Sequence, residues 1–240
     1  MRLNIPGLKI LYPVKCLVCG KVLWHDEHGV CDTCSDRLPY IRGDRCMICS
    51  KPVSKDEVYC RDCARTSHGY ECGYAMWSYN RITEGIVADI KYRRSLSGIE
   101  FMVSELVYRS ADLIRLWNVN AVVPVPLHRK KLKQRGFNQA GIIGEHYAAK
   151  LGICYIDDVL YRIRYTMPQK LFDDTGRKNN LQGAFRVDEE KLASYGKAEN
   201  VVLVDDIYTS GSTINECSMA LKEAGVKKVY FVCLCIGDGY

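Results

Sequence analysis

The stretch VVLVDDIYTSGST, residues 201–213, indicates how the C-terminal part of the chain folds. Its first four residues are apolar and predict a buried strand that ends at two carboxylates, Asp205 and Asp206. A hydroxyl-rich turn around Gly211 follows and opens a helix. The apolar residues of this helix recur at helical spacing and are Ile214, Cys217, Leu221 and Ala224. A strand, turn and helix in this order predict a helix N-terminus at the carboxyl edge of a sheet.

The turn itself has the composition of an anion site. Backbone N–H groups at a helix start are unpaired, and hydroxyl groups add further donors. The hydroxyl residues are Thr209, Ser210, Ser212 and Thr213. Carboxylates beside a phosphate would repel it unless they accept hydrogen bonds from hydroxyls or face a bridging cation. A ribose diol with a phosphate at its other end therefore fits, and the alternative is a strand that ends in solvated aspartates.

Segment 201–213 resembles the motif that binds phosphoribosyl pyrophosphate (PRPP) in type I phosphoribosyltransferases. The resemblance implies that Asp205 and Asp206 hold the ribose 2′ and 3′ hydroxyls, and that the turn holds the 5′-phosphate. Two rival nucleotide motifs are missing from the sequence, because no GxxxxGK[ST] occurs and no GxGxxG follows a predicted strand.

The composition is that of a globular chain. Of its 240 residues, 48% are apolar, which permits a substantial core. No apolar run reaches transmembrane length, and the N-terminus lacks the features of a signal peptide, so we expect a cytoplasmic protein without membrane insertion. The formal charge of +6 falls to about +2 if eight cysteine thiolates bind two Zn²⁺. Charge alone therefore does not predict nucleic-acid binding.

Eight of the 13 cysteines form four CxxC pairs, and the pairs repeat as a module of about thirty residues that occurs twice. In a reducing compartment such pairs favour structural zinc over disulfides. The module predicts one tetrahedral site from Cys16, Cys19, Cys31 and Cys34, and a second from Cys46, Cys49, Cys60 and Cys63. An interleaved arrangement, in which the first pair joins the third and the second joins the fourth, is the alternative.

The region after the cysteines predicts alternating strands and helices. A domain boundary is expected near residue 70, with a double zinc ribbon over 1–70 and an α/β domain over 71–240. Residues 73–80 resemble a strand, and helical spacing follows over 83–94 and 99–117. Lys91 lies in the basic end of the first helix and is a candidate for binding PRPP, although a solvated cationic helix end is the alternative.

A basic segment follows a short strand near residues 120–126. It runs from His128 to Arg135 and is interpreted as a loop at the carboxyl end of that strand, where a pyrophosphate would lie. We take His128, Arg129 and Lys130 as candidate ligands. In isolation the same run would suggest a nucleic-acid patch.

The CxxC pairs, VVPVPLHRKKLKQRGFNQA at 122–140, PQKLFDDTGRKNNLQGAF at 168–185 and VVLVDDIYTSGST together resemble the ComF family of competence-associated proteins. This resemblance implies a type I phosphoribosyltransferase domain preceded by a zinc ribbon. It also implies a loop over 164–183 that covers PRPP, with Gln169 reaching the pyrophosphate and Arg177 acting in catalysis beside the two aspartates. A disordered surface loop is the alternative.

The expected fold is therefore α/β, with a doubly wound parallel sheet of the type I phosphoribosyltransferase kind and a small N-terminal zinc-ribbon domain. The last strand, in residues 227–237, is apolar on both faces and is expected inside the sheet. One function hypothesis is transfer of phosphoribosyl from PRPP, with Mg²⁺, to an unknown acceptor in DNA uptake. The other is a non-catalytic nucleotide-binding or single-stranded-DNA-binding competence protein that docks a helicase.

Overall fold

A parallel sheet forms the centre of the protein. The computed structural model describes residues 14–23, 29–93, 96–164, 181–196 and 198–237, and this part of the chain contains a five-stranded sheet in the order β1-β7-β6-β2-β3. Every neighbouring pair of these strands is parallel. The strands are β1 (Gly73–Ser78), β2 (Ala121–Pro124), β3 (Cys154–Tyr155), β6 (Asn200–Tyr208) and β7 (Lys228–Ile236). Strand β7 is buried at every position after Lys228, as its apolar sequence predicts.

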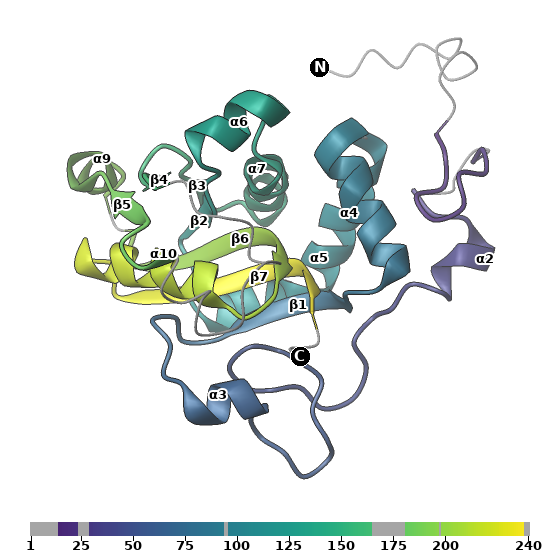
Figure 1. Ribbon diagram of the computed structural model, residues 1–240, viewed down its shortest axis with the longest axis horizontal. Coiled ribbons are helices and arrows are strands. Elements are labelled where there is room, and N and C mark those ends of the chain that lie inside the picture. The colour runs from purple at the N-terminus through teal and green to yellow at the C-terminus, as the bar shows by residue number, and fades with distance from the viewer. Residues whose placement is uncertain (1–13, 24–28, 94–95, 165–180, 197, 238–240) are drawn as a thin grey trace.

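Helices cover both faces of this sheet (Figure 1). On one face, α4 (Arg81–Arg93), α5 (Leu96–Leu116) and α7 (Gln139–Leu151) contribute to the same buried cluster as Val202 and Val232. On the other face, α10 (Ser212–Glu223) packs with Leu203 and Phe231. The alternation of neighbouring strand residues between the two clusters explains why both faces need a covering layer. The predicted doubly wound α/β fold is confirmed.

Smaller elements surround the sheet. They are α2 (Asp32–Ser35), α3 (Arg61–Arg65), α6 (Arg129–Arg135), α9 (Glu189–Ser194), β4 (Leu160–Arg162) and β5 (Phe185–Val187). Strands β4 and β5 pair antiparallel, with Leu160 opposite Val187. Among the described helices, none has the length and apolar character needed to cross a bilayer.

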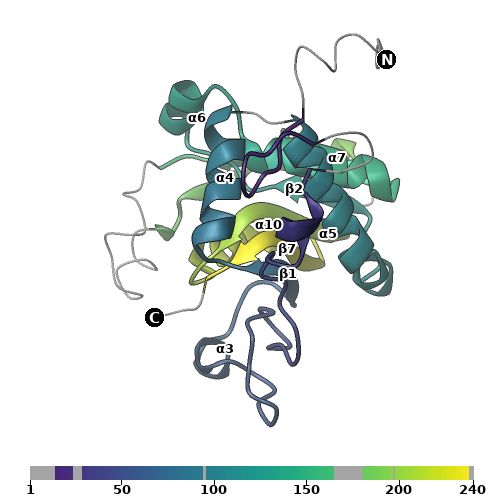
Figure 2. The same ribbon diagram turned by 90° about the vertical axis from the view of Figure 1, so that its right-hand side faces the viewer.

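The two cysteine modules pack on different parts of the α/β domain. The described residues of the first zinc module (16–23 and 29–34) lie on α5, where a Cβ added to Gly29 would come within 2.6 Å of Phe101. The second zinc module (residues 46–63) lies beside β1, where the N–H of Gly73 donates to the carbonyl of Ile48 at 2.9 Å. Two views at right angles show α3, which belongs to this second module, on the side of the sheet where β1 lies (Figure 1 and Figure 2).

The chain between the modules covers the edge of β1. Ser78 N–H donates to the Pro39 carbonyl at 2.9 Å, and Ile41 N–H donates to the Met76 carbonyl at 3.3 Å. Arg45 adds a side-chain bond to the carbonyl of Ala75 at 2.7 Å. An uncovered strand edge is a template for pairing with another chain, so these bonds protect the sheet.

Two predictions about local structure were wrong. Strand β6 does not end at Val204 but continues to Tyr208, because β7 is long enough to pair with it as far as Tyr208 opposite Ile236. The basic segment is not a loop, since residues 129–135 form α6, which ends at Gly136 in the left-handed conformation. The boundary near residue 70 stays a prediction.

Candidate functional site

The site lies where β2 ends and β6 continues. The pairing of β2 with β6 stops at Pro124 opposite Val204, whereas β6 remains paired to β7 through Asp205 opposite Cys233. A cavity of about 550 Å³ opens at this place, and both Asp205 and Asp206 line it. The end of a short strand beside a longer one therefore creates the space that the carboxylates face.

Asp206 is held by two side chains from the covering helices. It is only 6% exposed. Lys91 of α4 forms an ion pair with its Oδ2 at 2.7 Å, and Gln139 at the start of α7 donates to the same oxygen at 3.3 Å. The Oδ1 of Asp205 accepts the backbone N–H of Asp206 at 2.8 Å. The carboxylate pair is thus fixed in position before any ligand binds.

The charged form of Asp205 is disfavoured in this cavity. Burial and the neighbouring charge of Asp206 raise the pKa of Asp205 well above its ordinary value, although Lys91 partly opposes the shift. Two adjacent carboxylates in a desolvated place gain stability from a cation or from hydroxyl donors. The chemistry of this pair therefore suits a diol or a magnesium-bound ligand.

A cluster of cations lines the same cavity. It consists of Lys91 on α4, Lys131 and Arg135 on α6, and Arg162 at the end of β4. Burial and the positive charges of Arg162, Arg135 and Lys91 lower the pKa of Lys131. Lys91 is paired with Asp206, whereas the positive charges around Lys131 repel one another, so this part of the cluster suits a ligand with several negative charges.

The hydroxyl residues of the phosphate turn, residues 209–213, line two different cavities. Thr209 and Thr213 line the cavity with the aspartates, whereas Ser210 and Ser212 line a second cavity of about 440 Å³. Gly211 has φ of 78° and precedes the first residue of α10. That left-handed conformation favours glycine and turns the chain into the helix.

The candidate ligands on the basic segment lie at the margin of the site. Lys131 and Arg135 line the cavity, while His128, Arg129 and Lys130 are not among its lining residues. The Nδ1 of His128 accepts the backbone N–H of Lys130 at 3.2 Å, so His128 caps α6. Contact of these three residues with PRPP stays a prediction. Two further candidates, Gln169 and Arg177, lie outside the described residues.

Sequence reasoning missed several polar residues of the cavity, among them Gln139, Asn138 and Arg162, with Glu84 and Tyr79. Gln139 and Asn138 belong to the RGFNQA segment, and Arg162 comes from β4. The side-chain amide of Asn138 donates to the Val125 carbonyl at 3.0 Å, while its buried Oδ1 has no hydrogen-bond partner among the described residues. That oxygen is available to a ligand hydroxyl or a bound water. The sequence holds no local signal for these residues; the helical spacing of Lys131 and Arg135 indicates only that those two share one face.

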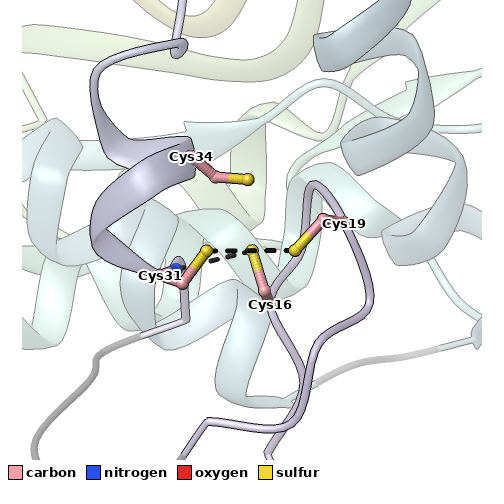
Figure 3. Close-up of side chains that lie close together, drawn as sticks. All are labelled: Cys16, Cys19, Cys31 and Cys34. Atoms are coloured by element: carbon pink, nitrogen blue, oxygen red, sulfur yellow. Dashed lines mark hydrogen bonds between the residues drawn. The ribbon is translucent and has the colours of Figure 1, made fainter.

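The eight paired cysteines form two separate clusters, as the repeat predicts. The clusters are Cys16, Cys19, Cys31, Cys34 and Cys46, Cys49, Cys60, Cys63, and within each the sulfur atoms lie within 4.8 Å of one another. Figure 3 shows the four sulfurs of the first cluster turned toward a common centre. The interleaved pairing is wrong, since each cluster draws only on its own module.

Both clusters have the chemistry of zinc sites. Burial raises the pKa of Cys16. Hydrogen bonds from the backbone N–H groups around its sulfur together outweigh this effect and lower the pKa to about 6. The same balance lowers the pKa of Cys46 to about 7. Near the second cluster, the buried Lys51 pairs with Asp62 at 2.7 Å. Four thiolate donors around one point match structural zinc and leave no coordination position for a substrate.

Comparison with protein families agrees with this architecture. A double zinc ribbon domain matches residues 7–64, and a phosphoribosyl transferase domain matches residues 145–239. The fold and these two matches give the chain an N-terminal double zinc ribbon followed by a domain of the phosphoribosyl transferase kind.

Individual relatives extend the similarity over most of the chain. Competence protein F of Haemophilus influenzae is 25% identical, over 90% of this chain and 93% of that protein. DNA utilization protein YhgH of Salmonella typhimurium is 28% identical, over 97% and 98% respectively. Competence protein ComFC of Bacillus subtilis is 24% identical, over 90% and 91%. The resemblance to the ComF family expected from the sequence is confirmed.

Proposed function

We propose that this protein binds PRPP with Mg²⁺ in the cavity beside Asp205 and Asp206 and transfers its phosphoribosyl group to an acceptor. The match to a phosphoribosyl transferase domain supports the proposal. The observation that carries it is that one cavity is lined both by carboxylates, Asp205 and Asp206 with Glu84, and by four cations, of which Lys91 is paired with Asp206. PRPP carries groups that match both kinds of side chain, since its diol needs hydrogen-bond acceptors and its pyrophosphate needs positive charge.

The two ends of PRPP have separate places in this proposal. Asp205 and Asp206 accept hydrogen bonds from the ribose diol, and the turn at residues 209–213 binds the 5′-phosphate through backbone N–H and hydroxyl groups. Lys131, Arg135 and Arg162 face the pyrophosphate. The exposed Arg129 and Lys130, with His128, add positive charge at the outer side of the cavity.

Catalysis in this arrangement needs no covalent nucleophile. The bond between C1′ and the pyrophosphate oxygen breaks, and its electron pair leaves with pyrophosphate. A lone pair of the acceptor forms the new bond to C1′, and the acceptor releases its proton to solvent or to the departing pyrophosphate. The cations stabilise the leaving charge, and the carboxylates stabilise the positive charge that develops on the ribose. Mg²⁺, when bound with PRPP, would neutralise pyrophosphate oxygens, with Asp205 and Asp206 as the residues able to hold it.

A role in DNA uptake is the cellular setting that we propose. It rests on the names of the relatives, which refer to competence and DNA utilization. A second candidate function is binding of single-stranded DNA or a nucleotide without turnover, together with a helicase. The exposed cations Arg129, Lys130 and Lys133 on α6 favour this alternative, because they lie outside the cavity lining and can face a phosphate backbone.

Titration calorimetry with PRPP and Mg²⁺ tests the proposal. Replacing both Asp205 and Asp206 by Asn preserves side-chain size but removes the charged acceptors. We expect the double variant to keep its zinc and to lose PRPP affinity by about tenfold or more, as charge-assisted hydrogen bonds are lost. Equal PRPP affinity in variant and parent would contradict the proposal.

Two further measurements distinguish the candidates. Titration of the same variant with single-stranded DNA should show unchanged or tighter binding if the site serves DNA alone, because carboxylates repel phosphates. Release of pyrophosphate from PRPP in the presence of candidate acceptors tests turnover. A parent protein that binds DNA but not PRPP would favour the second candidate.

A further inference from the structure

Three aromatic rings form a buried layer under the phosphate turn. Tyr208, the last residue of β6, stacks on Phe231 of β7 with ring centres 4.8 Å apart. Tyr70 approaches Phe231 edge-on at 5.1 Å. The hydroxyl groups of Tyr70 and Tyr208 share a buried hydrogen bond of 2.7 Å. Burial raises the pKa of Tyr70, although the hydrogen bond with Tyr208 partly opposes the shift, so the phenol stays neutral and can donate.

The turn lies directly on this hydroxyl pair. A Cβ built on Gly211 would come within 2.3 Å of the Tyr208 hydroxyl oxygen. The glycine thus allows the backbone of the turn to approach the phenol more closely than any other residue would permit. The position of the Tyr208 hydroxyl therefore limits where the turn can lie.

Tyr70 belongs to the segment that leaves the second zinc module. The N–H of Gly69 donates to Asn215 Oδ1 in the first turn of α10 at 2.8 Å, and the N–H of Glu71 donates to the Val229 carbonyl at 2.8 Å. The segment is therefore bonded to the chain before the phosphate turn, through Tyr208, and after it, through Asn215.

The sulfurs of this module share the same interior. Cys46, Cys49 and Cys63 are buried in one cluster with Tyr70 and Tyr208. A shift in the cysteine cluster would therefore reach the turn through packed rings and one hydrogen bond. The first zinc module has no comparable path among the described residues, because it packs on α5 with the other cluster.

We infer that the second zinc module positions the phosphate turn through Tyr70 and Tyr208, so that metal binding at this module and phosphate binding at the turn stabilise each other. Tyr70 and Tyr208 are positioning residues in this inference and do not touch the ligand. The inference rests on the proposed function in so far as the phosphate belongs to PRPP. Coupling of this kind acts equally in both directions.

Hydrogen exchange of the turn tests the inference without PRPP. Tyr70→Phe and Tyr208→Phe keep the rings but remove the hydroxyl bond. We expect amide exchange in peptides covering residues 209–215 to accelerate about three- to tenfold, the range for one buried hydrogen bond. Tyr147→Phe is the matched control, because it also removes a buried tyrosine hydroxyl, one bonded to Ser110 on α5. It should leave exchange in the turn unchanged.

The effect of phosphate binding on the metal is measured as the rate of zinc release from the full chain loaded with zinc. Saturating PRPP should slow transfer of one zinc ion per chain to a chelator, followed with a zinc indicator, and should leave the other unaffected. In Tyr70→Phe, saturating PRPP should slow zinc transfer to the chelator less than in the parent. The PRPP affinity of this variant should fall about three- to tenfold. Tyr147→Phe should behave as the parent in both measurements.

Failure of the inference and failure of the proposed function give different results. Turn exchange in Tyr70→Phe and Tyr208→Phe equal to that in Tyr147→Phe would overturn the inference, whether or not PRPP binds. Accelerated exchange in a protein whose parent form shows no PRPP binding would support the positioning role and reject PRPP as the ligand. Slowing of both zinc ions alike would also overturn the inference.

Discussion

Asp205 is expected to lower the stability of the unliganded protein while serving its ligand. Its pKa is raised by burial and by Asp206, so folding favours the protonated carboxyl. The stability that this preference contributes is present below the ordinary aspartate pKa and is lost as the pH rises through the raised pKa. Single residues that bind ligands commonly carry this kind of cost.

Asp205→Asn should therefore raise the thermal unfolding midpoint at pH above the raised pKa. We expect an increase of about 2–4 °C, the shift for about 1 kcal/mol in a chain of this size, and a smaller increase as the pH approaches the ordinary value of 3.8. Scanning calorimetry across pH measures both. A thermal midpoint of Asp205→Asn that lies below that of the parent by the same amount at every pH would show that the charged Asp205 carboxylate is stabilised by its surroundings in the folded protein.

Among single residues, the sequence allowed the two cysteine clusters and the two adjacent cavity carboxylates to be predicted. The zinc cysteines could be grouped because the repeat reports which pairs share a module. The paired aspartates could be placed because an apolar run precedes them. Arg162 and Gln139 could not be found, since their approach to the cavity depends on how β4 and α7 pack on the sheet. No local pattern encodes such a contact.

Among the elements, α6 offers a test of where the pyrophosphate lies. Lys131→Ala with Arg135→Ala removes two charges from the cavity lining, whereas Arg129→Ala with Lys130→Ala removes two charges from exposed positions. We expect the first pair to weaken PRPP binding by about tenfold or more, and the second by about twofold through long-range attraction alone. Calorimetric titration with PRPP at two salt concentrations compares them. Equal losses would mean that the net charge of α6, and not its cavity face, determines affinity.

The bounds of elements were less predictable than their order. Strand β6 continues four residues beyond its predicted end because a neighbouring strand, and not its own apolar run, decides where pairing stops. The basic segment was mistaken for a loop although Gly136, a helix-ending residue, follows it. The many charged residues hid the helical pattern of α6, a short helix that presents Lys131 and Arg135 to the cavity.

For the molecule as a whole, the sequence predicted two cysteine modules and a doubly wound sheet. It did not predict where on the α/β domain each module packs. One packs on α5 and the other beside β1, so the zinc ribbons act as separate parts of the surface layer. Each module is too small to bury a core alone. Their separate attachment follows from contacts such as Gly29 with Phe101, which connect positions far apart in the chain.

The separate attachment predicts different consequences of losing each metal. Cys60→Ser should reduce bound zinc from two ions per chain to one, lower the thermal midpoint and promote aggregation. The second module and the segment before it cover β1, and a freed strand edge pairs with other chains. Cys19→Ser should also lose one zinc but aggregate less, because its module covers a helix. Cys154→Ser, at an exposed cysteine outside both clusters, should keep both ions. Elemental analysis with light scattering measures these outcomes, and equal aggregation of Cys60→Ser and Cys19→Ser would show that the second module does not protect the edge of β1.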